Sequence, residues 1–269
     1  MIQVTAPVGM FDSGMGGLSV YREVRQELPA ESLVYIADSA HVPYGDKPPE
    51  YIERRASLLT EFLVQRHGVK AVVIACNTAT AFGVRSIRER FAVPVVAMEP
   101  ALRPAAATTR TGVVGVLATA GTLESSQFES LVDRFGKGVQ VVARPGSGLV
   151  EQVERGDVNG SATRAIVQEY LSPMLAAGAD AIVLGSTHYV FLRPLIQEMV
   201  GPKVALFDAG AAVARRLRQV LDEGSFLCGQ DGAAMERFWT SGDPAMVGTV
   251  ASKLLGRAVT FQRLPEKYG

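Results

Sequence analysis

The chain has 269 residues, of which 48% are hydrophobic, and this is enough for one large domain or for two small domains with their own cores. Its 27 Lys and Arg residues balance its 27 Asp and Glu residues, and neither sign forms a long run. This balance argues against a charged surface for nucleic acid or an anionic membrane, so we expect a small-molecule ligand and no nucleic-acid or membrane partner.

The N-terminus and the two cysteines favour a cytoplasmic protein. No apolar stretch reaches the roughly 18 residues of a membrane span, and the first residues lack the basic start and cleavage pattern of a signal peptide. Cys76 and Cys228 lie far apart and form neither a CxxC pair nor a metal-type spacing, which argues against a disulfide framework and a zinc site. We therefore predict a cytoplasmic location and no metal.

Apolar strand patterns alternate with helical patterns along the chain. The predicted strands lie at 8–12, 33–37, 68–76, 94–98, 114–118, 139–143, 178–186 and 203–207. The clearest helical patterns, with apolar residues three and four apart, lie at 18–28, 49–67, 79–91 and 162–177. Strands that alternate with helices in this way predict parallel sheets covered by helices on both faces.

The second half of the chain repeats the first. GVKAVVIACNT at 68–78 matches GADAIVLGSTH at 178–188, and this match aligns Cys76 with Ser186. The other matches are 8–13 with 114–119, 33–37 with 139–143 and 94–98 with 203–207. The repeat predicts two doubly wound α/β domains related by a pseudo-two-fold axis, with right-handed crossovers. We divide the chain into a first domain of residues 1–98 plus a C-terminal return at 206–269, and a second domain of residues 99–205.

Polar residues follow the predicted strands at their carboxyl ends, where open parallel sheets bind ligands. Asp12 and Ser13 follow the first strand, residues 38–44 the second, residues 76–78 the third, and residues 186–188 the matching strand of the second half. We therefore expect the active site in a cleft between the two domains, with the thiol and the serine hydroxyl on opposite sides.

The glycine-rich stretch at 12–17 (DSGMGG) has two interpretations. It is no dinucleotide fingerprint, because Ser19 stands where the last glycine would be, and the chain has no GK[ST] of a phosphate-binding loop. The glycines either form a tight strand-to-helix turn or present backbone N–H groups to a carboxylate at a helix N-terminus.

Cys76 has a structural and a chemical interpretation. A free cysteine is commonly a small buried hydrophobe. However, Cys76 ends an apolar strand and precedes Asn77 and Thr78, where a helix N-terminus can lower the pKa of a thiol.

His188 lacks an HxH or HxxxH partner, so it is either a hydrogen-bonding histidine or a group that tunes residue 186. The GSTHY sequence around Ser186 also lacks the GxSxG pattern of serine hydrolases. Cys228 has no chemically active neighbours in sequence, and we expect a structural role for it.

Five motifs carry a resemblance to a known family. They are FDSGMGG at 11–17, ADSAHVPYG at 37–45, ACNTA at 75–79, LVE at 149–151 and LGSTHY at 184–189. In this order and spacing they resemble the glutamate racemases of the cofactor-independent aspartate/glutamate racemase family, from residue 8 to about residue 221. The resemblance implies an isomerase that supplies D-glutamate for peptidoglycan, and hence for cell wall biogenesis and cell shape, and that needs no cofactor.

The resemblance also implies the roles of individual residues. Two cysteines on opposite faces of the substrate exchange the proton at Cα, and Cys76 takes one of these roles. Asp12 assists Cys76, and Glu151 and His188 assist the opposite side. The implied substrate-binding residues are Asp12, Ser13, Pro43, Tyr44, Gly45, Cys76, Asn77, Thr78, Thr119, Thr122, Ser186, Thr187 and His188.

Ser186 occupies the position of the second cysteine. An alcohol is a much weaker acid than a thiol, so we predict that this chain interconverts L- and D-glutamate poorly. The serine is either an introduced substitution or natural divergence. Natural divergence is included because Ala118, Arg144 and Val190 also depart from the family pattern.

Three further interpretations stay open from the sequence. Related folds with one cysteine act as decarboxylases, and Cys76 alone could protonate a carbanion on one face. The same alternative includes a racemase of another dicarboxylate in the same superfamily. Some family members are said to act on DNA gyrase, although the sequence offers no docking motif for it. Family members are commonly dimers, so the resemblance also implies a homodimer.

Overall fold

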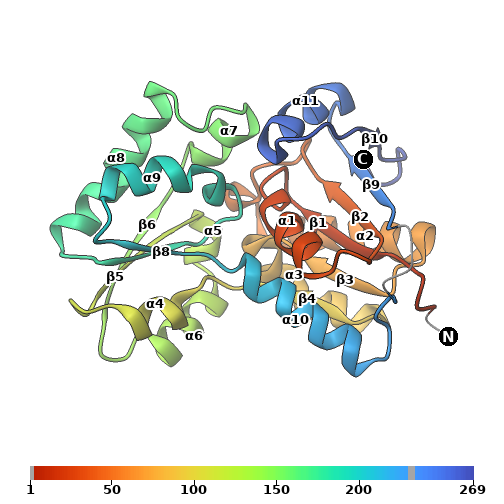
Figure 1. Cartoon of the computed structure of the whole chain (residues 1–269), viewed down its shortest axis with the longest axis horizontal. Helices are drawn as coiled ribbons and strands as arrows, with labels where there is room; N and C mark the ends of the chain where they lie inside the picture. Colours follow the sequence, from red (N-terminus) through yellow and green to blue (C-terminus); the bar gives the residue numbers. More distant parts are fainter. Residues whose placement is uncertain (1–2, 230–233) are drawn as a thin grey trace.

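The computed structural model describes residues 3–229 and 234–269, and it contains two parallel sheets that lie side by side (Figure 1). The strands are β1 (Val8–Asp12), β2 (Leu33–Ala37), β3 (Ala71–Ile74), β4 (Val95–Ala97), β5 (Val113–Ala118), β6 (Gln140–Pro145), β7 (Ala181–Leu184), β8 (Ala205–Phe207), β9 (Glu236–Thr240) and β10 (Phe261–Arg263). The helices are α1 (Leu18–Glu27), α2 (Pro49–His67), α3 (Asn77–Arg90), α4 (Leu102–Thr108), α5 (Ala120–Leu123), α6 (Ser126–Phe135), α7 (Leu149–Glu154), α8 (Ser161–Ala176), α9 (Arg193–Val200), α10 (Gly210–Glu223) and α11 (Pro244–Leu255), with short 3₁₀ helices η1 (Tyr44–Asp46) and η2 (His188–Leu192). Within these described ranges, every helix is too short or too polar to cross a membrane.

The two sheets share one strand order. The first sheet runs β10-β9-β2-β1-β3-β4 and the second runs β6-β5-β7-β8, so the last four strands of the first sheet correspond to the whole second sheet. The central strands also share a register, because Phe11 pairs with Ile74 and Leu117 pairs with Leu184. These are the residues that the sequence match equates, and the predicted fold class of two doubly wound parallel sheets is confirmed.

The outer strands correct one detail of the sequence match. Asp12 pairs with Ala37 in the first sheet, and Ala118 pairs with Pro145 in the second. Ala37 therefore corresponds to Pro145, and the match of 33–37 with 139–143 is wrong by two residues. Side chains alternate between the faces of a strand with a period of two, so a shift of two residues leaves the apolar pattern unchanged.

The proposed domain boundary at 205/206 falls inside a strand. β8 pairs with β7 from Ala205 opposite Ala181 to Phe207 opposite Val183, so a division that follows the sheets would lie after Phe207. The following helix, α10, contributes Leu217 to the same buried cluster as the first sheet. The chain therefore returns to the first half directly after β8.

Helices cover both faces of the first sheet, which explains why its inner strands are nearly all apolar. β1, β2 and β3 are buried along their whole length, as parallel strands between two helix layers must be. α1, α10 and α11 pack on one face and α2 and α3 on the other (Figure 1). The C-terminal strands β9 and β10 extend this sheet beyond β2.

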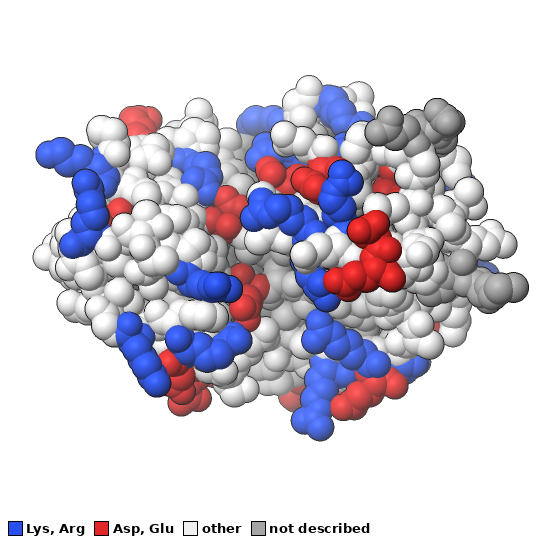
Figure 2. All heavy atoms as spheres, turned by 60° about the horizontal axis from the view of Figure 1, so that its bottom comes forward, with Lys and Arg blue, Asp and Glu red and all other residues white. Residues whose placement is uncertain are grey.

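Charged side chains of both signs are interspersed on the face of the molecule in Figure 2. Lys and Arg residues there stand close to Asp and Glu residues, and neither sign occupies a broad continuous area. This distribution agrees with the net charge of zero.

Candidate active site

A small pocket between the two halves brings together most of the residues that the sequence singled out. We call it the inner pocket, and it is lined by Ser13, Pro43, Tyr44, Gly45, Cys76, Asn77, Thr78, Thr119, Val150, Gly185, Ser186, Thr187 and His188. Asp12, Thr122 and Glu151 were also predicted for the site, but they do not line this pocket. Because the carboxyl ends of β1, β3, β5 and β7 all reach it, the pocket lies where parallel sheets bind ligands.

Cys76 caps the helix that begins at the next residue. Its Sγ accepts a hydrogen bond from the N–H of Ala79 at 3.4 Å and lies 3.9 Å from Ser13 Oγ. Burial raises the pKa of this thiol far above its ordinary value, and the charge of Asp12 raises it further. The hydrogen bond from Ala79 lowers the pKa only in part, so the sequence expectation of a lowered pKa is wrong in its net direction.

Asp12 lies beneath the pocket and is fully buried. Its Oδ2 accepts hydrogen bonds from the N–H of Gly17 at 2.7 Å and from Thr187 Oγ1 at 3.4 Å. Burial raises the pKa of Asp12, although the charge of His188 opposes this shift. A Cβ on Gly17 would stand 2.6 Å from the Asp12 Cβ, which agrees with the tight-turn interpretation of the glycine-rich stretch. The N–H of Gly17 is used by the carboxylate of Asp12 itself, and the binding of a ligand carboxylate by this stretch stays a prediction.

Ser186 follows β7 as Cys76 follows β3. The side chain lines the inner pocket and the residue is 6% exposed. Its hydroxyl makes no hydrogen bond to any of the described residues, whereas its backbone oxygen accepts one from Tyr189 at the start of η2. The hydroxyl is therefore available to a ligand in the pocket.

His188 contacts a carboxylate that the sequence did not identify. His188 Nε2 lies 2.7 Å from Glu154 Oε1 and 3.2 Å from the N–H of Gly16. One nitrogen cannot donate to the first group and accept from the second, and the shorter contact to a charged acceptor takes the proton. Burial lowers the pKa of His188, but the hydrogen bond to Glu154 and the charges of Asp12 and Glu154 outweigh burial and raise the pKa.

Glu154 also joins the two halves of the molecule. It stands at the end of α7 in the second half, and its Oε1 accepts a hydrogen bond of 2.6 Å from the N–H of Met15 in the first half. Glu151, the carboxylate chosen from the sequence, lies three residues earlier on the same helix. The sequence LVEQVE places a glutamate after a valine twice, so the motif alone could not distinguish the two.

Three threonine hydroxyls form a second link between the halves. Thr78 Oγ1 lies 2.9 Å from Thr119 Oγ1 and 3.1 Å from Thr122 Oγ1, and the last two lie 2.9 Å apart. Thr122 is thus connected to the inner pocket through its two neighbours. Asn77 Oδ1, in contrast, is buried and has no hydrogen-bond partner among the described residues, so it is an acceptor that a ligand can use.

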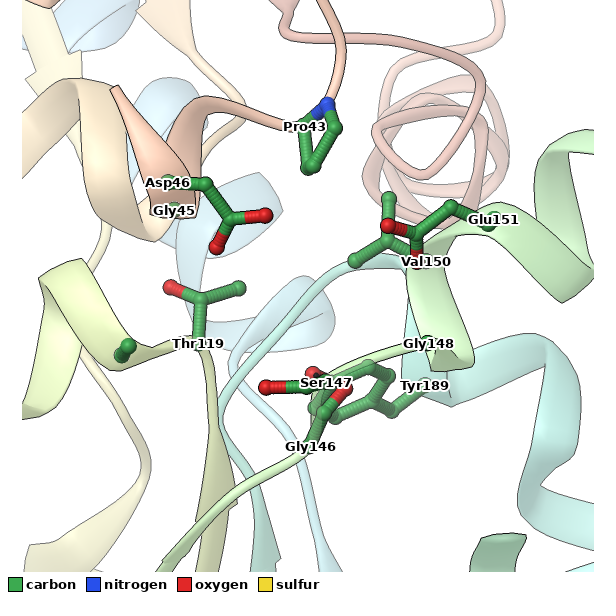
Figure 3. Close-up of a pocket in the computed structure, with 11 residues that line it drawn as sticks. Pro43, Gly45, Asp46, Thr119, Gly146, Ser147, Gly148, Val150, Glu151 and Tyr189 are labelled. Atoms are coloured by element: carbon green, nitrogen blue, oxygen red, sulfur yellow. Dashed lines mark hydrogen bonds between the residues drawn. The ribbon is translucent and has the colours of Figure 1, made fainter.

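Glu151 lies in a second cavity, which we call the outer pocket (Figure 3). Its lining is Pro43, Gly45, Asp46, Thr119, Ala120, Gly146, Ser147, Gly148, Val150, Glu151 and Tyr189. Pro43, Gly45, Thr119 and Val150 line both pockets, so the outer pocket adjoins the inner one.

In residues 3–229 and 234–269, no His, Cys, Asp and Glu side chains gather in a group that could hold a metal ion.

Replacing Glu154 with glutamine is expected to lower the pKa of His188, because the change removes the carboxylate charge and preserves the side-chain shape. Glu154 helps raise the folded-state pKa above the unfolded value of about 6.5. Its contribution to stability is therefore complete below about pH 6.5 and is lost as the pH rises through the folded pKa. The variant should lose free energy of unfolding at acidic pH and approach the unaltered chain at alkaline pH.

NMR titration of His188 and urea unfolding at several pH values measure these two effects. Glu151→Gln is the matched control, since it removes the same charge from the same helix but no hydrogen bond to His188. Glu151 raises the pKa of His188 through its charge alone, so the fall in this control should be the smaller of the two. An equal fall of the His188 pKa in both variants would contradict the assigned pairing.

Comparison with known proteins agrees with this arrangement. The family described as Asp/Glu/Hydantoin racemase matches residues 8–217. The chain is 52% identical over 266 residues to glutamate racemase from Stutzerimonas stutzeri, a match that covers 98% of this chain and 100% of that protein. It is 52% identical over 261 residues to glutamate racemase from Pseudomonas aeruginosa, with 97% and 98% of the two chains covered.

Solved structures show the same fold. The crystal structure of glutamate racemase isoform RacE1 from Bacillus anthracis has a TM-score of 0.86 and 28% identity over 97% of this chain and 98% of that chain. The Escherichia coli glutamate racemase, solved in complex with L-glutamate and the activator UDP-MurNAc-ala, has a TM-score of 0.85 and 30% identity, with 96% and 98% covered. The resemblance found in the motifs is confirmed, and the chain belongs to the Asp/Glu/Hydantoin racemase family.

Proposed function

We propose that the chain acts on glutamate and exchanges the proton at its Cα, so that L- and D-glutamate are interconverted to supply D-glutamate for peptidoglycan. The observation that carries this proposal is the placement of Cys76 and Ser186 at equivalent strand ends on one pocket. The curated relatives at about half identity are named glutamate racemases, which supports glutamate as the substrate.

Inversion at Cα requires proton donors and acceptors on both faces of the substrate. A single base returns the proton to the face from which it came, whereas two opposed groups invert the centre. In the first half, Asp12 accepts the proton of the Cys76 thiol, and the resulting thiolate removes the Cα proton. In the second half, the Ser186 hydroxyl would have to return a proton to the carbanion. His188 lines the same pocket and is hydrogen-bonded to Glu154.

Ser186 is expected to slow the proton transfer that the second half contributes to this reaction. A thiol has an ordinary pKa of about 8.5, whereas a hydroxyl is far less acidic and transfers a proton to a carbanion poorly. We therefore expect Cα exchange on the Cys76 side and slow inversion. The unpartnered Asn77 Oδ1 and the hydroxyls of Ser13, Thr78, Thr119 and Thr187 would bind the amino acid, with the peptide groups of the loop 43–45.

A second candidate function follows from the same observation. One thiol in the pocket is sufficient for an enzyme that removes CO₂ from a substituted malonate and protonates the carbanion on one face. This decarboxylase alternative needs neither a group at position 186 nor a second proton donor, so the serine itself favours it.

Hydrogen exchange in D₂O tests the proposal. The chain is incubated separately with L-glutamate, D-glutamate and a substituted malonate, and NMR follows the Cα signal while CO₂ release is measured. We expect loss of the Cα signal from one glutamate enantiomer, little loss from the other, and little inversion. CO₂ release from the malonate without exchange on either glutamate would instead favour the decarboxylase.

The cellular setting completes the proposal. We place the reaction in the cytoplasm, with glutamate as the small-molecule partner and a homodimer as the assembly. Neither a metal ion nor an organic cofactor enters the proposed steps, because thiol, hydroxyl, imidazole and carboxyl groups supply every proton transfer.

A further inference from the structure

A buried ion pair lies beneath the loop 43–45, outside the inner pocket. Asp38 follows β2 and is fully buried, and Arg55 of α2 is 5% exposed. Arg55 Nη2 lies 2.6 Å from Asp38 Oδ1, and Arg55 Nε lies 3.0 Å from Asp38 Oδ2. This two-pronged contact fixes the position and the orientation of the carboxylate.

The carboxylate in turn holds a side chain of the inner pocket. The hydroxyl of Tyr44 donates a hydrogen bond of 2.5 Å to Asp38 Oδ2. Tyr44 is almost fully buried, belongs to the same apolar cluster as Cys76, and lines the inner pocket. Burial raises the pKa of Tyr44 and the charge of Asp38 raises it further, so the phenol stays protonated and remains a donor.

Arg55 also donates hydrogen bonds to the backbone of the last two residues of the chain. Its Nη2 donates to the carbonyl oxygen of Tyr268 at 2.8 Å, and its Nη1 donates to the oxygen of Gly269 at 3.4 Å. The Tyr268 ring packs on Phe62 of α2 with ring centres 5.1 Å apart. Residues 264–269 thus pack against α2 and fix the guanidinium from outside.

We propose that Asp38 and Arg55 are positioning residues, which hold Tyr44 and the loop 43–45 in the geometry that binds substrate, with residues 264–269 as their outer support. A buried ion pair commonly adds little stability compared with apolar residues of the same size, so a role in positioning explains its presence better than a role in stability. The expected effect of these residues on substrate binding rests on the proposed function. Their expected effect on the access of reagents to the Cys76 thiol is independent of that function.

The test uses three variants and a matched set of controls. Tyr44→Phe removes the hydroxyl, Arg55→Lys keeps the charge but loses the two-pronged contact, and Asp38→Asn keeps the shape but loses the charge. The controls are Tyr21→Phe and Arg25→Lys, because Tyr21 and Arg25 both contact Glu236 in a similar tyrosine, carboxylate and arginine cluster that lines neither pocket.

Alkylation of Cys76 by iodoacetamide, located by mass spectrometry of its peptide, provides two measurements. The rate without ligand reports how well the loop shields the thiol, and the glutamate concentration that halves this rate reports binding. For Tyr44→Phe and Arg55→Lys we expect a severalfold higher rate and a half-protecting concentration about tenfold higher, equivalent to about 1.4 kcal/mol of binding free energy. The two controls should leave both values unchanged.

The outcomes separate this proposal from the proposed function. If glutamate does not protect the unaltered chain, the substrate is wrong, and the alkylation rates still decide whether the pair positions the loop. Rates that stay unchanged in Tyr44→Phe and Arg55→Lys would overturn the proposal, as would equal increases in the controls. If Asp38→Asn fails to fold, the other two variants carry the test, and the thermal midpoint of each variant is measured in parallel.

Discussion

Ser186→Cys is expected to raise the rate of glutamate racemisation by roughly 100-fold or more, within the 10²–10⁴ range that a positioned acid or base contributes. The substitution exchanges oxygen for sulfur at a strand end that corresponds to that of Cys76. It provides a thiol on each side of the inner pocket, so both faces of Cα gain an effective proton donor and acceptor. Circular dichroism of the glutamate solution measures the inversion, and NMR in D₂O measures the exchange.

Ser147→Cys is the matched control for this gain. It makes the same change of atom in the outer pocket, where Ser147 is part of the lining (Figure 3), and should leave racemisation unchanged. If Ser186→Cys gains no inversion although glutamate still protects Cys76 from alkylation, the missing thiol is not what limits racemisation, and the decarboxylase becomes the better assignment.

The duplication could be recognised in the sequence because the end of a buried strand has a clear local pattern, an apolar run that stops at polar residues. The apolar runs that stop at Cys76 and Ser186 lie in β3 and β7 and in the loops after them, and parallel sheets bring such ends to one edge. From this, the inner pocket and most of its lining could be predicted without coordinates. The glycines of 12–17 could likewise be recognised as candidates for a tight turn, although the pattern did not show which of them the turn requires.

Other features depend on contacts that a local pattern does not contain. Glu154 and Glu151 occupy similar places in LVEQVE, and only the packing of α7 against the loop 15–16 decides which one meets His188. The pKa of Cys76 depends on how completely the surrounding structure buries the thiol, and burial outweighs the hydrogen bond from the helix N-terminus. β9 pairs with β2 although more than 190 residues of chain separate them, and β10 pairs with β9. Periodicity carries no information over such a distance.

Moving the single thiol to the other half is expected to reverse the enantiomer that exchanges its Cα hydrogen. The double variant Cys76→Ser, Ser186→Cys keeps one thiol and one hydroxyl but interchanges their sides. A lone thiolate reaches the Cα proton of only one enantiomer, because the proton of the other enantiomer points to the opposite face. The unaltered chain and the double variant should therefore show opposite preferences in D₂O.

Cys76→Ser alone provides the baseline for this reversal, because it leaves two hydroxyls and no thiol in the inner pocket. Exchange should fall by roughly 100-fold or more for the enantiomer that the unaltered chain exchanges, and it should stay low for the other enantiomer. Cys228→Ser is the control for loss of a thiol elsewhere, since Cys228 contacts Lys70 and the backbone of Val4 away from the pocket, and it should change nothing. If the double variant exchanges the same enantiomer as the unaltered chain, the two strand ends do not face opposite sides of the substrate. Thiols at both positions would then reach the same face of the substrate. The duplicated fold would in that case not provide two opposed catalytic groups.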